Sequence, residues 1–113
     1  MNKKGRPRKK KIIQQHPGID TFSPENIAAN TEKVILSLEE YETIRLYDHQ
    51  GLDQKTAAGM MGISQQSFSL ILRKARRKVS DALVNAKCVK ISGGDFINKR
   101  SADVIRRIRG LLN

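Results

Sequence analysis

The sequence has no tryptophan, three phenylalanines, two tyrosines and one cysteine among its 113 residues. Proteins that bind RNA or single strands stack bases on exposed aromatic side chains, so this scarcity argues against such a platform. A lone cysteine excludes a disulfide framework within the chain and indicates a reducing compartment. No apolar run approaches the length of a signal-peptide core or a membrane span, so we expect a cytoplasmic protein with no membrane partner.

Residues that build catalytic or metal centres are also scarce. The chain has two histidines, and it lacks the CxxC, HExxH, GxSxG and GxGxxG patterns. Paired acid and base catalysts could come from Glu39, Glu40, Glu42 and Asp48, but carboxylates in the first turn of a helix are stabilised by the helix dipole without any catalytic role. We therefore expect a protein that is not an enzyme and that uses no metal or cofactor.

Positive charge is abundant and unevenly spread over the chain, whose formal net charge is +11. Residues 1–11 contain seven basic residues and no acidic one, whereas residues 12–50 contain two basic and seven acidic residues. Residues 51–88 and 89–113 are basic again, with net charges of +5 and +4. This distribution favours a polyanionic partner, most commonly the phosphate backbone of a nucleic acid, although an anionic membrane surface would also attract it.

The first eleven residues, MNKKGRPRKKK, have no apolar side chain after Met1 and cannot bury enough surface to fold alone. We expect a mobile basic arm. Its Arg6-Pro7-Arg8 segment resembles the core of an AT-hook, in which arginines enter a narrow A·T minor groove. Pro7 supports this by favouring an extended Arg6. The alternative is a solvated tail that contacts phosphates without sequence preference.

A capping box marks the first expected helix. The side chain of Ser37 can accept a hydrogen bond from the amide of Glu40, whose carboxylate can return to the serine amide, and Gly51 ends the helix. Residues 34–36 form a short β-prone run, and residues 89–91 alternate like a strand that could pair with it, although nothing in the sequence fixes that pairing. Because helical signals dominate, the expected fold class is all-α with three to four helices.

A pair of helices joined by a tight turn is predicted between Leu52 and Val79. Asp53 can cap the first helix and Ser64 the second, while Gly62 between them is free to take a positive φ. The second helix should extend to about residue 85. Small and bulky apolar side chains can form one interior between the helices: Leu52, Ala57, Ala58, Met61, Ile63, Phe68, Ile71 and Leu72. This combination predicts a helix-turn-helix.

These motifs also resemble a known family. The residues that carry the resemblance include Leu38-x-x-Tyr41-Glu42-x-Ile44-Arg45-Leu46, Ala57-Ala58-x-x-Met61-Gly62-Ile63-Ser64, Ala75-Arg76-Arg77-Lys78-Val79 and Gly5-Arg6-Pro7-Arg8. Over residues 5–94 the chain is similar to the domain-of-unknown-function 134 family, also called uncharacterised protein family 0251. The resemblance implies DNA binding by a helix-turn-helix like that of sigma-factor region 4. This chain has Gln65 or Gln66, and Leu70 or Ile71, where the resemblance leads us to expect arginines, so base preference does not carry over.

The second helix of the pair is the expected recognition helix. Its first turns should present these polar side chains to the major groove of double-stranded DNA: Ser64, Gln65, Gln66, Ser69 and Arg73. A glutamine amide can pair with adenine and an arginine with guanine. The alternative for the two neighbouring glutamines is a solvated polar patch. Lys55 and Thr56, at the start of the preceding helix, are expected to contact phosphates.

A basic run follows on the same helix, and it has two interpretations. Arg73, Arg76 and Arg77 could clamp flanking phosphates, or they could form an ordinary solvated face that Asp81 partly neutralises. Only the first interpretation assigns these arginines to the DNA-binding site.

Together these features divide the chain into an AT-hook-like arm (1–11), a connecting segment (12–33), a helix-turn-helix domain (34–94) and an amphipathic C-terminal helix (95–113). The stripe of that last helix should pack on its own domain or on a second subunit, or else lie on a membrane surface: Val104, Ile105, Ile108, Leu111 and Leu112. We expect a homodimeric, nucleoid-associated transcription regulator. The alternative is an adaptor that contacts the transcription machinery through the acidic residues 39–42.

Overall fold

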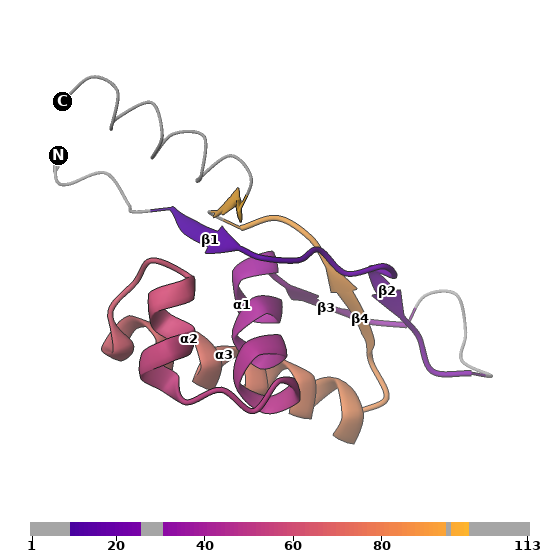
Figure 1. Ribbon diagram of the computed structural model, residues 1–113. Coiled ribbons are helices and arrows are strands. Elements are labelled where there is room, and N and C mark those ends of the chain that lie inside the picture. Colours follow the sequence, from indigo (N-terminus) through magenta and orange to yellow (C-terminus); the bar gives the residue numbers. More distant parts are fainter. Residues whose placement is uncertain (1–9, 26–30, 95, 100–113) are drawn as a thin grey trace, which may run out of the picture.

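The computed structural model describes residues 10–25, 31–94 and 96–99. Its strands are β1 (Lys11–Ile13), β2 (Thr21–Phe22), β3 (Lys33–Leu36), β4 (Cys88–Ile91) and β5 (Phe96–Asn98). Its helices are α1 (Leu38–Thr43), η1 (Ile44–His49), α2 (Gln54–Met60) and α3 (Gln65–Val84). The helices gather on one side and the strands run along the other (Figure 1).

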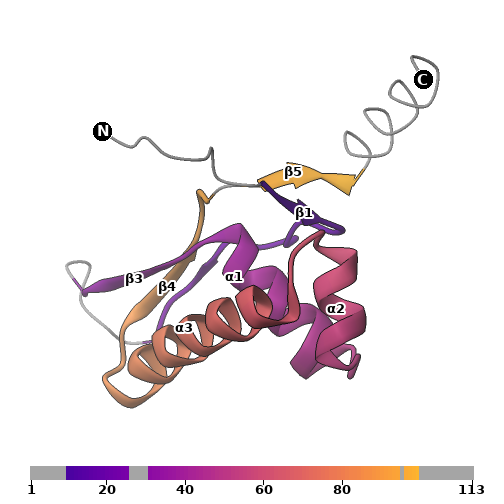
Figure 2. The same cartoon turned by 90° about the vertical axis from the view of Figure 1, so that its left-hand side faces the viewer.

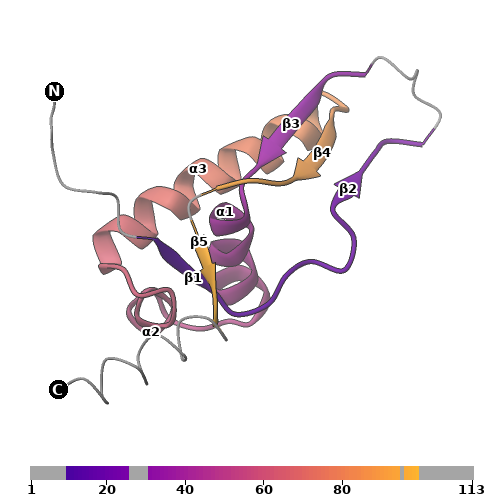
Figure 3. The ribbon, with the colours of Figure 1, turned by 90° about the horizontal axis from the view of Figure 1, so that it is seen from above.

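The expectation of an all-α fold was wrong, because the described residues form a mixed α/β structure. β4 is the central strand of a three-stranded sheet, in which β3 pairs with it in parallel and β2 pairs with it antiparallel. The pairing of residues 34–36 with residues 89–91, which the sequence left open, is present, with Leu36 opposite Ile91. Figure 3 shows β3 and β4 side by side along α3.

A separate pair of strands comes from two distant parts of the chain. β1 and β5 run parallel, with Lys11 opposite Phe96 and Ile13 opposite Asn98. Lys11, assigned above to the basic arm, and residues 12–13 and 21–22, assigned to the connecting segment, thus form β1 and β2. The sequence signal for β1 and β2 was weak because these strands have only three and two residues, so no alternation of apolar and polar side chains develops in them.

The capping box at the start of α1 is confirmed. The amide of Glu40 donates to Ser37 Oγ at 3.1 Å, and the Glu40 carboxylate accepts from the Ser37 amide at 2.9 Å. α1 continues directly into η1, a π-helix whose wider turn is closed by the Gln50 amide donating to the Arg45 carbonyl at 2.8 Å. Gly51, with a φ of +76°, ends this helical stretch as expected.

α3 joins two clusters of buried side chains. Its first half packs with α2 and η1, and its second half packs against the three-stranded sheet (Figure 2). The first cluster contains Leu46, Ala57, Ala58, Met61, Phe68 and Leu72, and the second contains Leu36, Ala75 and Ile91. α3 ends at Val84, close to the expected residue 85. No helix within the described ranges is long and apolar enough to cross a membrane.

Candidate nucleic-acid interface

Two capped helices and the turn between them form what we call the α2–α3 unit, residues 53–84. Asp53 accepts a hydrogen bond from the Thr56 amide at 2.8 Å, and Ser64 accepts one from the Ser67 amide at 3.0 Å, so both expected caps are confirmed. The bond from the Thr56 amide lowers the pKa of Asp53 below its ordinary value. Gly62, with a φ of +69°, makes the turn.

The two faces of α3 differ sharply in character. Phe68 and Ala75 are 0% exposed and Leu72 is 2% exposed, so this face is committed to the interior. The opposite face exposes polar or basic side chains of the predicted site: Gln65, Gln66, Arg73 and Arg77. Ser64 at the cap is exposed as well, whereas Ser69 is half-buried at the border between the two faces.

Arg76 differs from its basic neighbours because it is bound to another helix. Its guanidinium donates to both carboxylate oxygens of Asp48 in η1 and lies 5.4 Å from the centroid of the Tyr47 ring. The hydrogen bonds to Asp48 raise the pKa of Arg76. Within the part of the chain that the structure describes, Arg73 and Arg77 have no acidic partner. Of the three predicted arginines, these two are therefore available for a ligand.

Asp81 does not neutralise this basic run as the sequence suggested it could. Its carboxylate accepts from Lys87 at 2.9 Å and from the Asn85 amide group at 2.7 Å, and the bond from Lys87 is the main cause of its lowered pKa. Lys78, the next basic residue on α3, does not pair with Asp81 but donates to the Glu40 carboxylate at 2.7 Å and to the Ile35 carbonyl at 2.9 Å. Lys78 therefore fixes α3 to α1 and β3.

The predicted phosphate contacts lie at the start of α2. Lys55 is exposed, and no acidic residue among those described pairs with it. Thr56 is exposed too, but its hydroxyl donates to the second carboxylate oxygen of Asp53 at 3.1 Å, so it already has a partner. Arg6 and Arg8 of the basic arm lie outside the described residues.

The strand that follows the basic arm is attached to the α2–α3 unit. The amide of Ile12 in β1 donates to the Met61 carbonyl at 3.0 Å. The Ile12 side chain packs over the turn so closely that a Cβ added at Gly62 would lie 3.2 Å from Ile12 Cδ1. β1, into which the basic arm leads, is therefore fixed beside the turn between α2 and α3.

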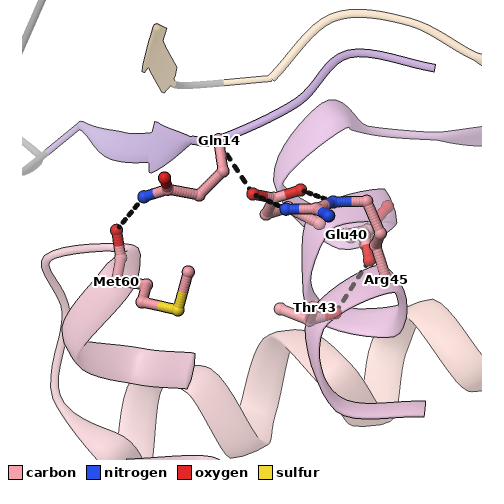
Figure 4. Close-up of polar contacts among 6 residues, drawn as sticks. Gln14, Glu40, Thr43, Arg45 and Met60 are labelled. Atoms are coloured by element: carbon pink, nitrogen blue, oxygen red, sulfur yellow. Dashed lines mark hydrogen bonds and ion pairs between the residues drawn. The ribbon is translucent and has the colours of Figure 1, made fainter. Parts of the chain in front are cut away.

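Gln14 connects β1 to two helices at once (Figure 4). Its side-chain amide donates to the Met60 carbonyl at 3.0 Å, while its backbone amide donates to the Glu42 carboxylate at 2.7 Å. Arg45 donates to the same carboxylate from Nε at 2.8 Å and from Nη2 at 3.1 Å. These bonds to Glu42 raise the pKa of Arg45. This cluster was not predicted from the sequence, although the spacing of Glu42 and Arg45 by three residues was a signal for it.

The acidic residues considered for an adaptor surface are engaged inside the molecule. Glu42 is 0% exposed and Glu40 is 6% exposed. Glu39 is half-buried and pairs with Lys11 of β1 at 3.3 Å. Residues 39–42 therefore do not present an open acidic patch to a partner.

An apolar groove of about 570 Å³ lies at the other end of α3. Its walls come from α1, α3 and the three-stranded sheet, and they include Phe22, Leu36, Tyr41, Val79, Leu83 and Val89. Leu83 is 79% exposed at the groove, and the neighbouring Val84 is 80% exposed. Cys88 is buried, and its Sγ lies 3.2 Å from Ser23 Oγ. This burial fits a cysteine that packs in the interior.

Residues 1–99 match the family described as "Protein of unknown function DUF134". The chain belongs to this family. A UPF0251 protein of Methanococcus vannielii is 46% identical over 95 residues, which cover 83% of this chain and 73% of the relative. A UPF0251 protein of Methanosarcina acetivorans is 39% identical over 102 residues, which cover 89% and 91%. No solved structure matches the chain.

Proposed function

We propose that this DUF134 chain is a non-enzymatic, sequence-specific double-stranded DNA-binding protein that regulates transcription. In this proposal the α2–α3 unit acts as a helix-turn-helix and inserts the first half of α3 into the major groove. The observation that carries it is the division of α3 into a buried apolar face and an exposed face with Gln65, Gln66, Arg73 and Arg77. Amide and guanidinium groups can pair with the adenine and guanine edges in that groove.

The attachment of β1 supports a role for the basic arm in the same complex. Lys11 lines a shallow groove together with Ser67, Leu70 and Lys74 of α3, so the arm begins on the side of the candidate interface. In the proposed mode the arm enters the minor groove next to the site of α3. Deletion of residues 1–10 should weaken binding more on A·T-flanked sites than on G·C-flanked sites. Equal losses on both would remove the minor-groove role and leave a phosphate role.

Selection of bound duplexes from a random library tests the proposal directly. Enrichment of a defined sequence is expected, and a palindromic one would also report the geometry of a dimer. Weak binding that is indifferent to sequence at physiological salt would overturn the proposal and favour an adaptor role. Residues 39–42 offer no open acidic surface that would support the adaptor role, because Glu40 and Glu42 are buried.

Salt dependence tests the two available arginines. If Arg73 and Arg77 contact phosphates, replacing both with alanine should flatten the slope of log affinity against log salt by about 0.9 for each lost contact. The control replaces Lys33 and Lys90, which lie on the three-stranded sheet, and removes the same formal charge. Lys90 also loses its ion pair with Asp20, and the slope should stay unchanged. An unchanged slope in the arginine variant would exclude both residues from the interface.

We further propose that two copies associate through the apolar groove. The groove and the exposed Leu83 and Val84 give α3 an apolar end opposite its polar first half, and regulators with a helix-turn-helix commonly act as twofold dimers. Leu83→Glu should convert a dimer to a monomer in analytical ultracentrifugation. A wild-type chain that sediments as a monomer at micromolar concentration would refute this assembly.

A further inference from the structure

Leu70 is an apolar side chain in the middle of the polar face of α3. It is 53% exposed. On the helix it follows Gln66 by four residues and precedes Arg73 by three, so the three side chains lie along one stripe. Both neighbours are exposed, and Arg77 continues the stripe one turn further. A leucine at this position contributes little to the interior of the protein.

The chemistry of the major groove offers this side chain one specific apolar partner. Each base pair presents hydrogen-bonding groups there, but only thymine adds a methyl group, at C5. Gln66 and Arg73 can bond to the base edges on either side, while Leu70 can make no hydrogen bond. An apolar group between them therefore adds discrimination only where a methyl group lies opposite.

We infer that Leu70 is a specificity residue that contacts the C5 methyl group of a thymine in the bound site. The inference rests on the proposed function, because it requires the outer face of α3 to lie in the major groove. It adds a base preference at Leu70, one of the two residues, Leu70 or Ile71, where the resemblance led us to expect an arginine. A leucine there selects thymine, whereas an arginine would select guanine.

Deoxyuridine substitution isolates this contact, since deoxyuridine keeps every hydrogen-bonding group of thymine and lacks only the methyl group. In the duplex selected by the wild-type protein, each thymine is replaced singly by deoxyuridine. One of these replacements should weaken wild-type binding about fourfold, which is the effect expected from losing the burial of one methyl group. For Leu70→Ala the same replacement should have no effect. Ile35→Ala, which truncates a side chain of similar exposure (49%) on β3, should keep the fourfold effect.

The possible outcomes separate the two proposals. A selected site whose thymine methyl groups are all dispensable, or a methyl effect that persists in Leu70→Ala, would overturn the role of Leu70 and leave DNA recognition by α3 standing. Failure of the wild-type protein to select any sequence would overturn both proposals. Far-UV circular dichroism of Leu70→Ala should match that of the wild type, because its side chain is exposed.

Discussion

Arg45 should be among the most sensitive positions in this fold, because it neutralises a buried carboxylate. The Glu42 side chain is 0% exposed, and two of its three observed donors belong to Arg45. Arg45→Met keeps apolar volume but leaves the carboxylate with the Gln14 amide alone. Removing one partner of a buried ion pair costs about 3–5 kcal/mol. That is a large fraction of the roughly 5–15 kcal/mol that stabilises a small protein.

Replacing both partners should be less damaging than replacing Arg45 alone. An apolar pair of similar volume often substitutes for a buried ion pair with little loss. In Glu42→Met/Arg45→Met the Gln14 amide loses its acceptor, which costs about 1–3 kcal/mol. The control is Arg76→Met, which breaks the ion pair with Asp48. Those two side chains are 51% and 38% exposed, and exposed pairs contribute at most about 1 kcal/mol.

Urea denaturation followed by far-UV circular dichroism measures these differences, since the chain has no tryptophan to serve as a fluorescent probe. The expected order of stability is wild type and Arg76→Met, then the double variant, then Arg45→Met. If the free energy of unfolding of Arg45→Met lies within about 1 kcal/mol of the wild-type value, the Glu42 carboxylate is not a buried group that depends on its arginine. A double variant less stable than Arg45→Met would show that Glu42 stabilises the fold without its arginine.

Two further predictions concern the α2–α3 unit. Gly62→Ala should lower the thermal midpoint of unfolding more than Gly51→Ala does. Both positions have a positive φ, which costs about 1–2 kcal/mol for a residue with a Cβ. Of the two, only Gly62 also faces the Ile12 side chain, which an added Cβ would crowd. Equal midpoints would show that the Ile12 contact does not constrain the turn. The Thr56 amide lowers the pKa of Asp53, so the stability from this cap is complete above the unfolded-state pKa and is lost as pH falls through the lower folded-state pKa. Asp53→Ala should therefore flatten the acid limb of stability against pH, and an unchanged limb would contradict a role for this cap.

The helices were predictable because their signals are local. Ser37, Asp53 and Ser64 each cap a helix through an amide three residues ahead, so a short stretch of sequence contains the whole interaction. The π-helical turn of η1 has no such local signal. The two sheets had no such local signal either, since Lys11 pairs with Phe96 in one and Leu36 with Ile91 in the other, each across a long stretch of sequence.

The candidate interface was predictable to a similar extent. Spacing alone separated the face with Gln66 and Arg73 from the face with Phe68, and the structure has the same division. Spacing could not show that Arg76 is bound by Asp48, because that partner lies 28 residues away on another helix. The burial of Glu42 was not predicted either. Spacing indicated its pairing with Arg45, three residues ahead, but the contact from the Gln14 amide comes from a distant part of the chain.

The position of β1 limits where the arm can act in the proposed complex. Were residues 12–33 an open connection, the first 33 residues could extend over roughly 110 Å. With Ile12 bound to the turn, residues 1–11 reach at most roughly 40 Å, close to the 34–36 Å of about one duplex turn. This restriction raises the effective concentration of the arm at the neighbouring minor groove. Gln14→Ala, which removes the bond to Met60, should therefore broaden the protected region on DNA more than it weakens binding by α3. A footprint as narrow as that of the wild type would show that the arm finds its groove without β1.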